Sequence, residues 1–410
     1  SEFTGYDALE GEATVLALRR DGSDEQQVDE GDEVEAYLDR TPFYAESGGQ
    51  VGDTGRLLGP AGEVQVEDTR RPFEGVIAHL GRMSVGRLRV GDRVTASVDG
   101  SRRRQIMRHH TATHLLNRAL EELLGRRNLQ RGSLVAADHT TFDFPLDRPL
   151  GDDELAGLER RVNEQVRAAL PLHVQVLPYE EAIATGATHL FDEKYGDQVR
   201  VVCLGDWSCE FCGGTHTQTS ADVGFALITS ETSVGQGHRR IDMTVGESAE
   251  QLVRRRLGHL NEVARSLGVG PEAVGDRVAE LQRELRDARR QAERLRDEAR
   301  AATVRGGDGG PRRRQASVPL ILETVEADGF DDLLGWADRY LEALGGSGVV
   351  GVTNDDIFAI KVSRDLAAEH QAPKLALHLG KGGGNNPLLA RGKLTKPAEE
   401  AFQELEATLR

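Results

Sequence analysis

The chain is poor in cysteine, in lysine and in long apolar runs. No apolar run among its 410 residues is long enough to span a bilayer, and the start lacks the pattern of a signal peptide. We therefore expect no membrane association. The three cysteines (Cys203, Cys209 and Cys212) lie within ten residues of one another, which is no disulfide framework. This usage predicts a reducing, cytoplasmic location, with Cys203 and Cys209 as small core residues.

Lysine is scarce as well, so nearly all positive charge comes from arginine. The formal net charge of −17 argues against a nucleic-acid partner, but the charge is segregated along the chain. Acidic residues are dense in 21–35, whereas arginines cluster in 102–108, 126–131 and 312–314. Arginine is the better bidentate ligand for phosphate, so the net charge is a poor guide to whether the chain binds nucleic acid. A codon bias towards arginine is the alternative explanation.

The length and the modest hydrophobic fraction of 38% predict several small domains instead of one large core. Residues 4–100 alternate short apolar stretches with Gly-Asp turns, a pattern typical of a small β-barrel. The opening Ser1-Glu2-Phe3 is typical of an expression-vector remnant, so we leave it out of the fold prediction. It also favours a truncated piece of a longer protein, although a free-standing protein is the alternative.

Residues 101–250 have a mixed α and β pattern, which predicts an α+β domain. Apolar residues at helical spacing predict a helix over Arg104–Leu124, and a second helix is expected over Asp152–Leu170, before Pro171. Residues 251–305 contain a heptad-like 4-3 repeat that begins at Val274, and this predicts a coiled-coil spacer. The glycine-rich stretch 305–311 is expected to be a turn or linker.

Residues 315–410 predict a final α/β domain. Strands are expected over 318–325, 348–353 and 357–362, with helices over 330–344 and 397–410. The fold class predicted for the whole chain is therefore α+β multidomain, with a barrel, an α+β domain, a helical spacer and a C-terminal α/β domain.

Two histidines on the first predicted helix are candidate metal ligands. His110 and His114 are one turn apart, on the face opposite the apolar stripe, where we expect exposed imidazoles. Thr111 follows the first histidine in place of the glutamate that zinc proteases carry, which argues against a protease. The neighbouring His109 points about 100° away and is expected to be solvated or near phosphate.

A second pair of candidate ligands lies about one hundred residues later. Cys212 and His216 flank a Gly-Gly-Thr turn, and glycine permits the tight backbone that lets both side chains reach one ion. A thiolate combined with imidazoles favours zinc. Cys209 and Cys212 also form a Cys-x-x-Cys, but no second such pair completes a four-cysteine site.

The two motifs, His110-Thr111-Ala112-Thr113-His114 and Cys212-Gly213-Gly214-Thr215-His216, resemble those of the alanyl-tRNA synthetase editing domain. Further matching stretches are 6–10, 40–50, 132–135, 193–197 and 239–241. The last domain is similar to the DHH-associated C-terminal domain of that family, although its glycine motif is only partly kept. Phe211 and His238 are departures from the family pattern.

The resemblance implies one zinc per chain, bound by His110, His114, Cys212 and His216. It also implies hydrolysis of the ester in Ser-tRNA(Ala) and Gly-tRNA(Ala), with Thr113 and Gln130 lining the pocket. The tRNA is expected to contact Arg239, Arg240, Lys381 and Gly383, and the C-terminal domain to support a homodimer. Nothing in the chain resembles the adenylate-forming domain, so we do not expect it to charge tRNA.

Two alternatives stay open at this point. One is a free-standing deacylase that acts in trans, and the other is a tRNA-binding and dimerising module with a purely structural zinc. Four protein ligands close a tetrahedral shell, whereas a catalytic zinc needs an open position. The sequence does not decide between these two roles of the ion.

Overall fold

The computed structural model describes residues 1–189, 196–235, 237–305 and 311–410, and forms two compact units, residues 1–262 and 263–410. Both contain helices and sheets, so the predicted α+β multidomain class is confirmed. The glycine-rich stretch 306–310 and most of the 193–197 motif lie outside the described residues. Among the helices that are described, none is both long and apolar enough to cross a membrane.

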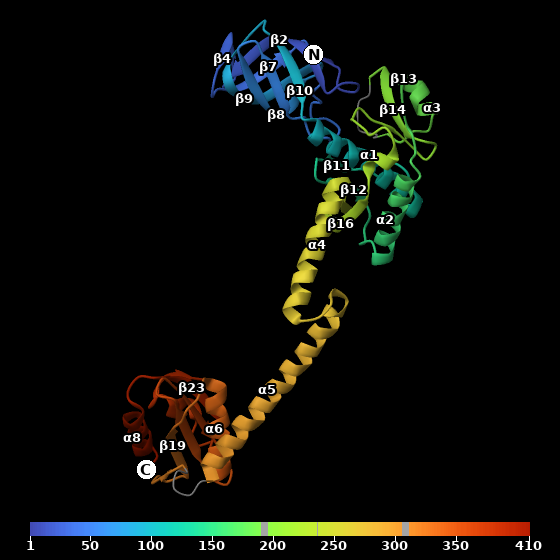
Figure 1. Ribbon diagram of the computed structural model, residues 1–410. Coiled ribbons are helices and arrows are strands. Elements are labelled where there is room, and N and C mark those ends of the chain that lie inside the picture. The colour runs from blue at the N-terminus through green and yellow to red at the C-terminus, as the bar shows by residue number, and fades with distance from the viewer. Residues whose placement is uncertain (190–195, 236, 306–310) are drawn as a thin grey trace. The chain divides into compact units, whose positions relative to one another are not determined.

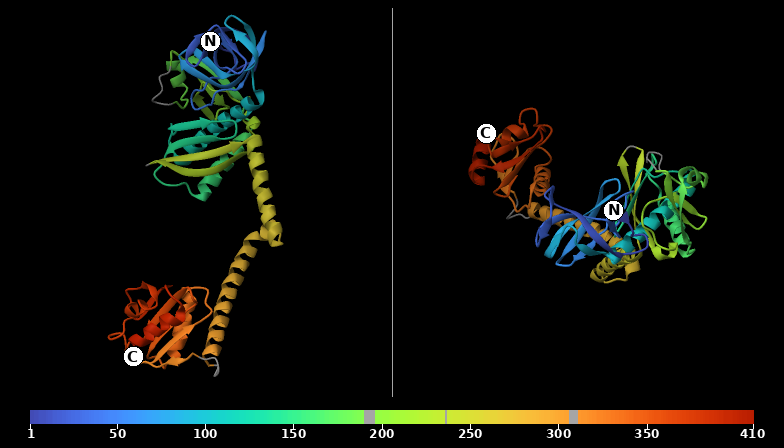
Figure 2. Two further views of the ribbon diagram at one scale, coloured as in Figure 1. Left: turned by 90° about the vertical axis from the view of Figure 1, so that its left-hand side faces the viewer. Right: turned by 90° about the horizontal axis from the view of Figure 1, so that it is seen from above.

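The N-terminal part of the first unit is a closed antiparallel barrel, as the sequence predicted (Figure 1). Its six strands pair in the order β10-β7-β8-β9-β5-β2, and pairing of β10 with β2 closes the ring. Their bounds are β2 Glu10–Arg20, β5 Glu33–Leu38, β7 Gly55–Gly59, β8 Gly62–Phe73, β9 Val76–Arg89 and β10 Arg93–Val98. The short strands around them are β1 Glu2–Phe3, β3 Ser23–Glu25, β4 Gln27–Asp29 and β6 Arg40–Thr41. Figure 2 shows the barrel, in blue, from two other sides.

Alternation of residue types along each barrel strand fills the interior. In β5, Val34, Ala36 and Leu38 are buried, whereas Glu33 is exposed and Glu35 and Tyr37 are half-buried. This two-residue period places one face of each strand inside the barrel. The excluded start of the chain proved to belong to the fold, because β1 pairs with β6 and Phe3 packs edge-on against Tyr6 and Tyr44. Leaving out Ser1–Phe3 was therefore wrong.

Beyond the barrel, the first unit contains α1 Gly100–Leu124, a four-stranded antiparallel sheet β11-β12-β17-β16 and a three-stranded sheet β13-β14-β15. The strands of these sheets are β11 Gly132–Val135, β12 Thr140–Pro145, β13 Leu172–Pro178, β14 Gln198–Leu204, β15 Ser208–Phe211, β16 Ala226–Gly235 and β17 His238–Val245. The other helical segments are α2 Asp152–Arg167, α3 Tyr179–Ala184 and a 3₁₀ turn Ser220–Val223. The apolar stripe of α1 forms one core with α2 and the four-stranded sheet.

Two long helices follow, α4 Gly246–Leu267 and α5 Val274–Arg305, with a 3₁₀ turn Pro271–Ala273 before α5. The predicted heptad repeat lies on α5, but three of its large apolar residues, Val278, Leu285 and Leu295, are 40%, 52% and 57% exposed. Because these residues are exposed, α5 forms no coiled coil with another helix among the described residues. The coiled-coil spacer therefore stays a prediction.

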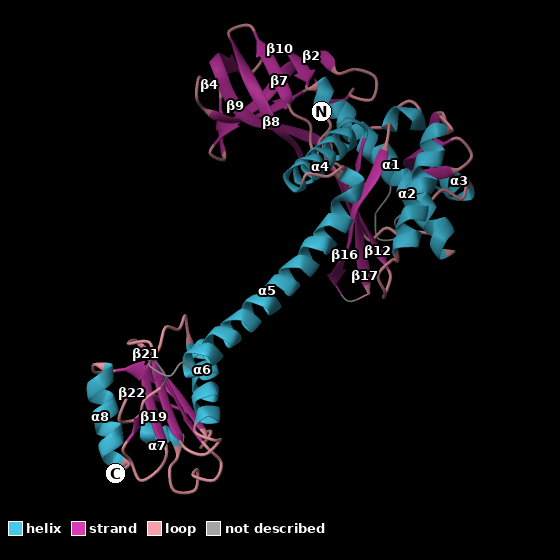
Figure 3. Ribbon diagram, turned by 60° about the horizontal axis from the view of Figure 1, so that its bottom comes forward, coloured by secondary structure: helices cyan, strands magenta, loops and turns pink. Residues whose placement is uncertain are grey.

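The C-terminal unit is a six-stranded sheet in the order β18-β19-β20-β21-β23-β22. Its strands are β18 Arg313–Arg314, β19 Leu320–Thr324, β20 Val349–Thr353, β21 Ile357–Val362, β22 Gly380–Gly383 and β23 Leu389–Leu394. Its helices are α6 Phe330–Ala343, α7 Ala372–Ala376 and α8 Ala398–Thr408, with α6 and α8 on opposite faces of the sheet (Figure 3). In β19, Ile321 packs on the α6 side while Leu320 and Leu322 pack on the side of α7 and α8.

One buried ion pair connects the barrel to α1. Arg103 is 1% exposed, and its Nε donates to both Asp53 carboxylate oxygens at 2.9 Å. The same guanidinium donates to the carbonyls of Gly5 and Pro42 at 2.8 and 2.9 Å. Three barrel-side segments are thus fixed to a single side chain of α1.

Removing one partner of a buried ion pair strands the other charge, which typically costs about 3–5 kcal/mol. We expect Arg103→Met to lower the stability of the first unit by this amount. Urea unfolding followed by Trp207 fluorescence, in a Trp336→Phe background, measures it. The neighbouring Arg104 is exposed, so Arg104→Met is the matched control and should change stability by no more than about 0.5 kcal/mol. Equal losses in the two variants would contradict the role of the pair.

Candidate metal centre

Helix α1 carries two of the candidate ligands and has well-defined ends. The side chain of Asp99 caps its N-terminus by accepting from the backbone N–H groups of Ser101 and Arg102, both at 3.0 Å. Gly125 ends it in the left-handed conformation, with φ 64°, where glycine is favoured. The helix therefore holds His110 and His114 one turn apart, with ring centroids 5.3 Å from each other.

The two imidazoles are buried, which corrects the expectation that they are exposed. His110 is 5% and His114 is 4% exposed. The apolar stripe of α1 faces the core as predicted, but the opposite face is also covered, by the segment that runs from β15 to residue 217. Helical periodicity locates the apolar face and says nothing about a cover contributed by residues a hundred positions away.

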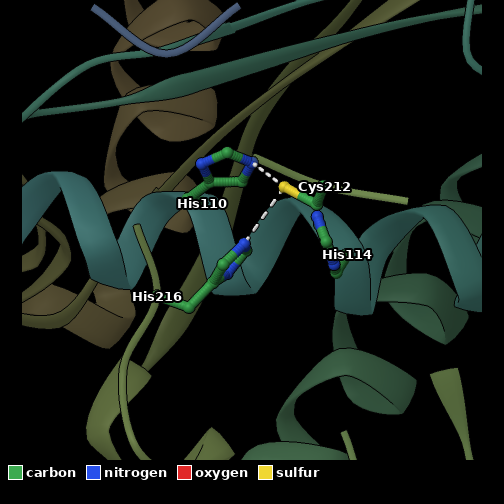
Figure 4. Close-up of side chains that lie close together, drawn as sticks. All are labelled: His110, His114, Cys212 and His216. Atoms are coloured by element: carbon green, nitrogen blue, oxygen red, sulfur yellow. Dashed lines mark hydrogen bonds between the residues drawn. The ribbon is translucent and has the colours of Figure 1, made fainter. Parts of the chain in front are cut away.

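The covering segment brings Cys212 and His216 to the histidines of α1 (Figure 4). Cys212 Sγ lies 3.3 Å from His110 Nε2 and 3.2 Å from His216 Nε2. One ligand atom from each of the four residues falls within 4.8 Å of the other three. The four side chains, two from each predicted pair, therefore form one group that could hold a metal ion.

The turn between Cys212 and His216 requires glycine at one of its two glycine positions. A Cβ on Gly214 would lie 2.0 Å from His110 Cε1, whereas a Cβ on Gly213 would meet nothing within 4 Å. The imidazole of His110 thus packs directly against the backbone of the turn. The N–H of Gly214 also donates to Cys212 Sγ at 3.3 Å, which stabilises a thiolate there.

The three imidazoles of the group are held in the neutral form. Burial lowers the pKa of His110 to about 3, with a further contribution from the charge of Arg200. Burial also holds the pKa values of His114 and His216 well below the usual range, and the neighbouring rings and Arg200 act in the same direction. A neutral imidazole is the form that binds a metal, so the protonation state of the three rings suits metal coordination.

Hydrogen bonds behind the rings fix their orientation. His110 Nδ1 lies 2.7 Å from Oε1 of Gln50, a residue of the loop after β6, and His216 Nδ1 lies 3.2 Å from the hydroxyl of Thr111. Gln50 Oε1 also accepts from the N–H of Thr215 at 3.0 Å, which identifies it as the oxygen of the amide. Nδ1 of His110 is therefore protonated, and its Nε2 lone pair faces Cys212.

A cavity of about 140 Å³ is lined by three of the four candidate ligands, His110, His114 and Cys212. Thr113 and Gln130, the two predicted pocket residues, both line it, together with Glu210. The Thr113 hydroxyl donates to the carbonyl of His109 at 2.8 Å and lies 2.8 Å from the Thr140 hydroxyl, while Gln130 Nε2 donates to Ser133 Oγ at 3.2 Å. Both predicted residues thus lie at the cavity, with their polar groups engaged.

Glu210 is a cavity residue that we did not predict. Its carboxyl accepts from Asn117 Nδ2 at 3.0 Å and lies 3.6 Å from His114 Nε2. Burial raises the pKa of this carboxyl to about 8. Its position two residues before a candidate cysteine ligand was the only signal in the sequence, and that signal does not distinguish it from any other strand residue.

Two further expectations about this region were wrong. His109 is fully buried instead of solvated, since its ring lies between the carbonyl of Gln105 and the N–H of Val245, and burial lowers its pKa to about 4. Cys203 and Cys209 form a disulfide instead of packing as separate thiols. They occupy directly opposed positions of β14 and β15, with their Cα atoms 4.1 Å apart, so the hairpin brings the two sulfurs together.

The predicted tRNA-contacting residues are divided between the two units. Arg239 and Arg240 are on β17, and their guanidinium groups are paired with Glu231 and Asp143. Lys381 and Gly383 are exposed on β22 of the C-terminal unit. Arg239 and Arg240 do not line the cavity, and Lys381 and Gly383 belong to the other unit, so the role of all four stays a prediction.

Comparison with known proteins connects this site to one enzyme family. A family model described as tRNA synthetases class II (A) matches residues 1–102, and one described as Threonyl and Alanyl tRNA synthetase second additional domain matches residues 199–242. The alanine–tRNA ligase of Chloroflexus aurantiacus is 40% identical over 415 residues, and that of Halorhodospira halophila is 39% identical over 422 residues. The chain is homologous to the C-terminal half of alanine–tRNA ligases.

These alignments cover 95% and 100% of this chain but 46% and 48% of the two ligases, so the chain spans about half the length of these relatives. A solved structure, the C-Ala domain of the Aquifex aeolicus alanyl-tRNA synthetase, aligns with 24% of this chain and 97% of its own length. Its identity is 23% and its TM-score is 0.21, a value too low to establish a shared fold. Cys212, His216, Arg239 and Arg240 all fall within the second additional domain that the threonyl and alanyl synthetases share.

The hydrogen bond between Gln50 and His110 predicts that Gln50 affects the zinc affinity of this chain. Loss of a group that orients a metal-ligating histidine typically weakens metal binding by about 10–100-fold. We expect Gln50→Ala to weaken zinc binding by this factor, measured by competition with a chromogenic chelator. Gln50→Glu keeps an acceptor oxygen and should restore part of the affinity. Gln65→Ala, which removes a glutamine bonded only to the Gly55 carbonyl on the barrel, is the control. Tight binding by Gln50→Ala would show that His110 needs no such support.

Proposed function

We propose that this chain is a zinc-dependent deacylase that hydrolyses the ester of Ser-tRNA(Ala) and Gly-tRNA(Ala). The observation that carries the proposal is the convergence of His110, His114, Cys212 and His216 beside a small cavity. Homology to alanine–tRNA ligases and the match to the second additional domain support the substrate class. As the chain matches about half of each relative, their ligase activity is not assigned to it.

The chemistry of the donor set fits zinc. Three neutral imidazoles and one thiolate are the ligands that Zn²⁺ takes in tetrahedral sites. When bound, zinc would supply a Lewis acid that stabilises negative charge on the ester or lowers the pKa of water. Three buried imidazoles and one half-buried thiol gathered at a single place support one ion per chain.

The residues of the cavity would orient the substrate. The cavity is small enough to favour a glycyl or seryl group, and its polar lining suits the ester and the amino group. Thr113 would contact the hydroxyl of a seryl group, and Gln130 the adjacent part of the aminoacyl end. Glu210, which is buried beside His114 and lines the cavity, would form a hydrogen bond with the substrate.

Positive residues outside the cavity would bind the rest of the tRNA. The guanidinium of Arg240 is 39% exposed beside Asp143 and could exchange this carboxylate for a phosphate. Lys381 and Gly383 would contribute from the domain at 315–410, which we propose as a second tRNA-binding and dimerisation element. The heptad-bearing segment 251–305 would serve as the spacer.

Removal of single ligands tests the proposed activity. The purified chain is expected to bind one zinc and to release serine from Ser-tRNA(Ala), and Cys212→Ala and His114→Ala should lose both properties. The Cys203→Ser/Cys209→Ser double variant and His173→Ala, an exposed histidine of β13, should keep both. Circular dichroism and thermal unfolding establish that the variants are folded. Full hydrolysis by folded Cys212→Ala or His114→Ala would sink the proposal.

A substitution of Thr113 tests whether the cavity recognises the substrate independently of zinc binding. Thr113→Val keeps the shape of the side chain and removes the hydroxyl, so zinc content should not change. The rate ratio of Ser-tRNA(Ala) to Gly-tRNA(Ala) deacylation should fall by about tenfold, the worth of one hydrogen bond of about 1.4 kcal/mol. An unchanged ratio with unchanged zinc would remove Thr113 from substrate recognition.

A further inference from the structure

All three carbonyls of the Cys212-Gly213-Gly214 turn accept hydrogen bonds from two side chains outside the ligand set. The Tyr6 hydroxyl donates to the Gly213 carbonyl at 2.7 Å. Arg200 Nη1 donates to the carbonyls of Cys212 and Gly214 at 2.8 and 3.0 Å. The backbone that links two candidate ligands is thus held at each successive peptide.

Tyr6 and Arg200 also contact each other. The guanidinium carbon of Arg200 lies 4.2 Å from the centroid of the Tyr6 ring, a cation–π geometry. Arg200 belongs to β14, and its own carbonyl accepts from the N–H of Cys212 at 3.0 Å. The start of the turn is therefore held by the backbone of Arg200, and its middle and end by the two stacked side chains.

The helix that carries His110 and His114 fixes the position of Tyr6. Arg103 of α1 donates to the carbonyl of Gly5, the residue before Tyr6, at 2.8 Å. A Cβ on Gly5 would lie 2.1 Å from the Pro42 carbonyl oxygen, so only glycine permits this close approach. Phe3 packs edge-on against the other side of the Tyr6 ring, with centroids 4.9 Å apart. Tyr6 therefore connects α1 to the turn that bears the other two ligands.

A turn with two consecutive glycines needs such a support. Glycine loses more conformational freedom on ordering than any other residue, so an unsupported Gly213-Gly214 would leave the Cys212 thiolate poorly placed. Tyr6 and Arg200 donate to the carbonyls of the turn, whereas the Gly214 N–H donates to Cys212 Sγ. The support and the ligand thus use opposite sides of the same peptides.

We propose that Tyr6 and Arg200 are positioning residues that clamp the Cys212–Gly214 turn, so that Cys212 and His216 reach a metal held by His110 and His114. The N-terminal segment before the barrel is then a working part of the metal centre. This inference rests on the proposed function in so far as the four donors bind a metal ion. It assigns to Tyr6 and Arg200 an effect on metal affinity and on the Cys212–metal bond.

Metal binding by the full chain tests the clamp. Tyr6→Phe keeps the ring and removes the hydroxyl, and should weaken zinc binding by about three- to tenfold, the worth of one hydrogen bond. Arg200→Met removes two hydrogen bonds and should weaken binding by about 10–100-fold. Arg200→Lys retains a charged donor and should restore part of this loss. In the cobalt-substituted protein, the thiolate-to-cobalt absorption should weaken in the same order.

Matched controls come from the same unit. Tyr37→Phe removes a tyrosine hydroxyl that donates to Glu35 on the barrel, and Arg161→Met removes a guanidinium that stacks on Trp207. Both should bind zinc as tightly as the parent protein. Tyr6→Phe and Arg200→Met variants that match these controls in affinity and cobalt spectrum would overturn the clamp. The proposed deacylase function would survive that result, because the parent protein would still bind zinc and hydrolyse the ester.

A second measurement does not depend on the metal. In the metal-free protein, amide hydrogen exchange over residues 212–216 should be at least several-fold faster in Tyr6→Phe and Arg200→Met than in Tyr37→Phe and Arg161→Met. If the parent protein failed to bind zinc, the proposed function would be rejected. Hydrogen exchange would then be the measurement that tests the clamp. Unchanged exchange in both variants would then reject it.

Discussion

The packing of three buried imidazoles and one half-buried thiol against one another is the constraint on which the first unit depends. A buried polar group costs free energy unless it is hydrogen-bonded or bound to a metal. His110 is supported by Gln50 and His216 by Thr111, while the N–H of Gly214 donates to Cys212. Gln50, Thr111 and the Gly214 N–H therefore supply the hydrogen bonds that offset the burial of these polar side chains.

These partners come from segments far apart in the chain, so the barrel is structurally part of the site. Gln50 and Asp53 lie in the loop between β6 and β7, and Tyr6 lies before β2. The Arg103–Asp53 ion pair holds the loop and the N-terminal segment on α1. A small displacement of the barrel relative to α1 would therefore disturb both the support of His110 and the contact of Tyr6 with the Gly213 carbonyl.

The N-terminal barrel and the C-terminal sheet bury their apolar residues in different ways. The barrel closes upon itself and needs no helix over its core, whereas the C-terminal sheet is covered by α6 on one face and by α7 and α8 on the other. Between them, α5 keeps apolar residues such as Leu285 exposed. Apolar residues at heptad spacing predict a partner helix, and the described part of this chain does not supply one.

The sequence by itself determined the elements whose signals are local. Short apolar stretches between Gly-Asp turns predicted the barrel strands, and the spacing of leucines and alanines predicted α1, with His110 and His114 on one side. The three strands and two helices predicted in the C-terminal domain lie within a few residues of their predicted bounds, and glycine or proline marks most of their ends, whereas β18, β22, β23 and α7 were not predicted. The chemistry of the ligand set also followed from two short motifs.

Tertiary structure alone decided what surrounds that ligand set. The burial of His110 and His114 depends on the segment around residues 208–217, which lies a hundred positions from α1, and the ring of His109 meets the N–H of the equally distant Val245. The Cys203–Cys209 disulfide depends on the register of β14 and β15. Tyr6 and Gln50 lie in stretches that resemble the alanyl-tRNA synthetases, and Arg200 lies in none of them. The sequence indicated a role for none of the three, since each acts through a contact with a distant residue. Periodicity reports which face of an element is apolar, but only packing determines which residues meet there.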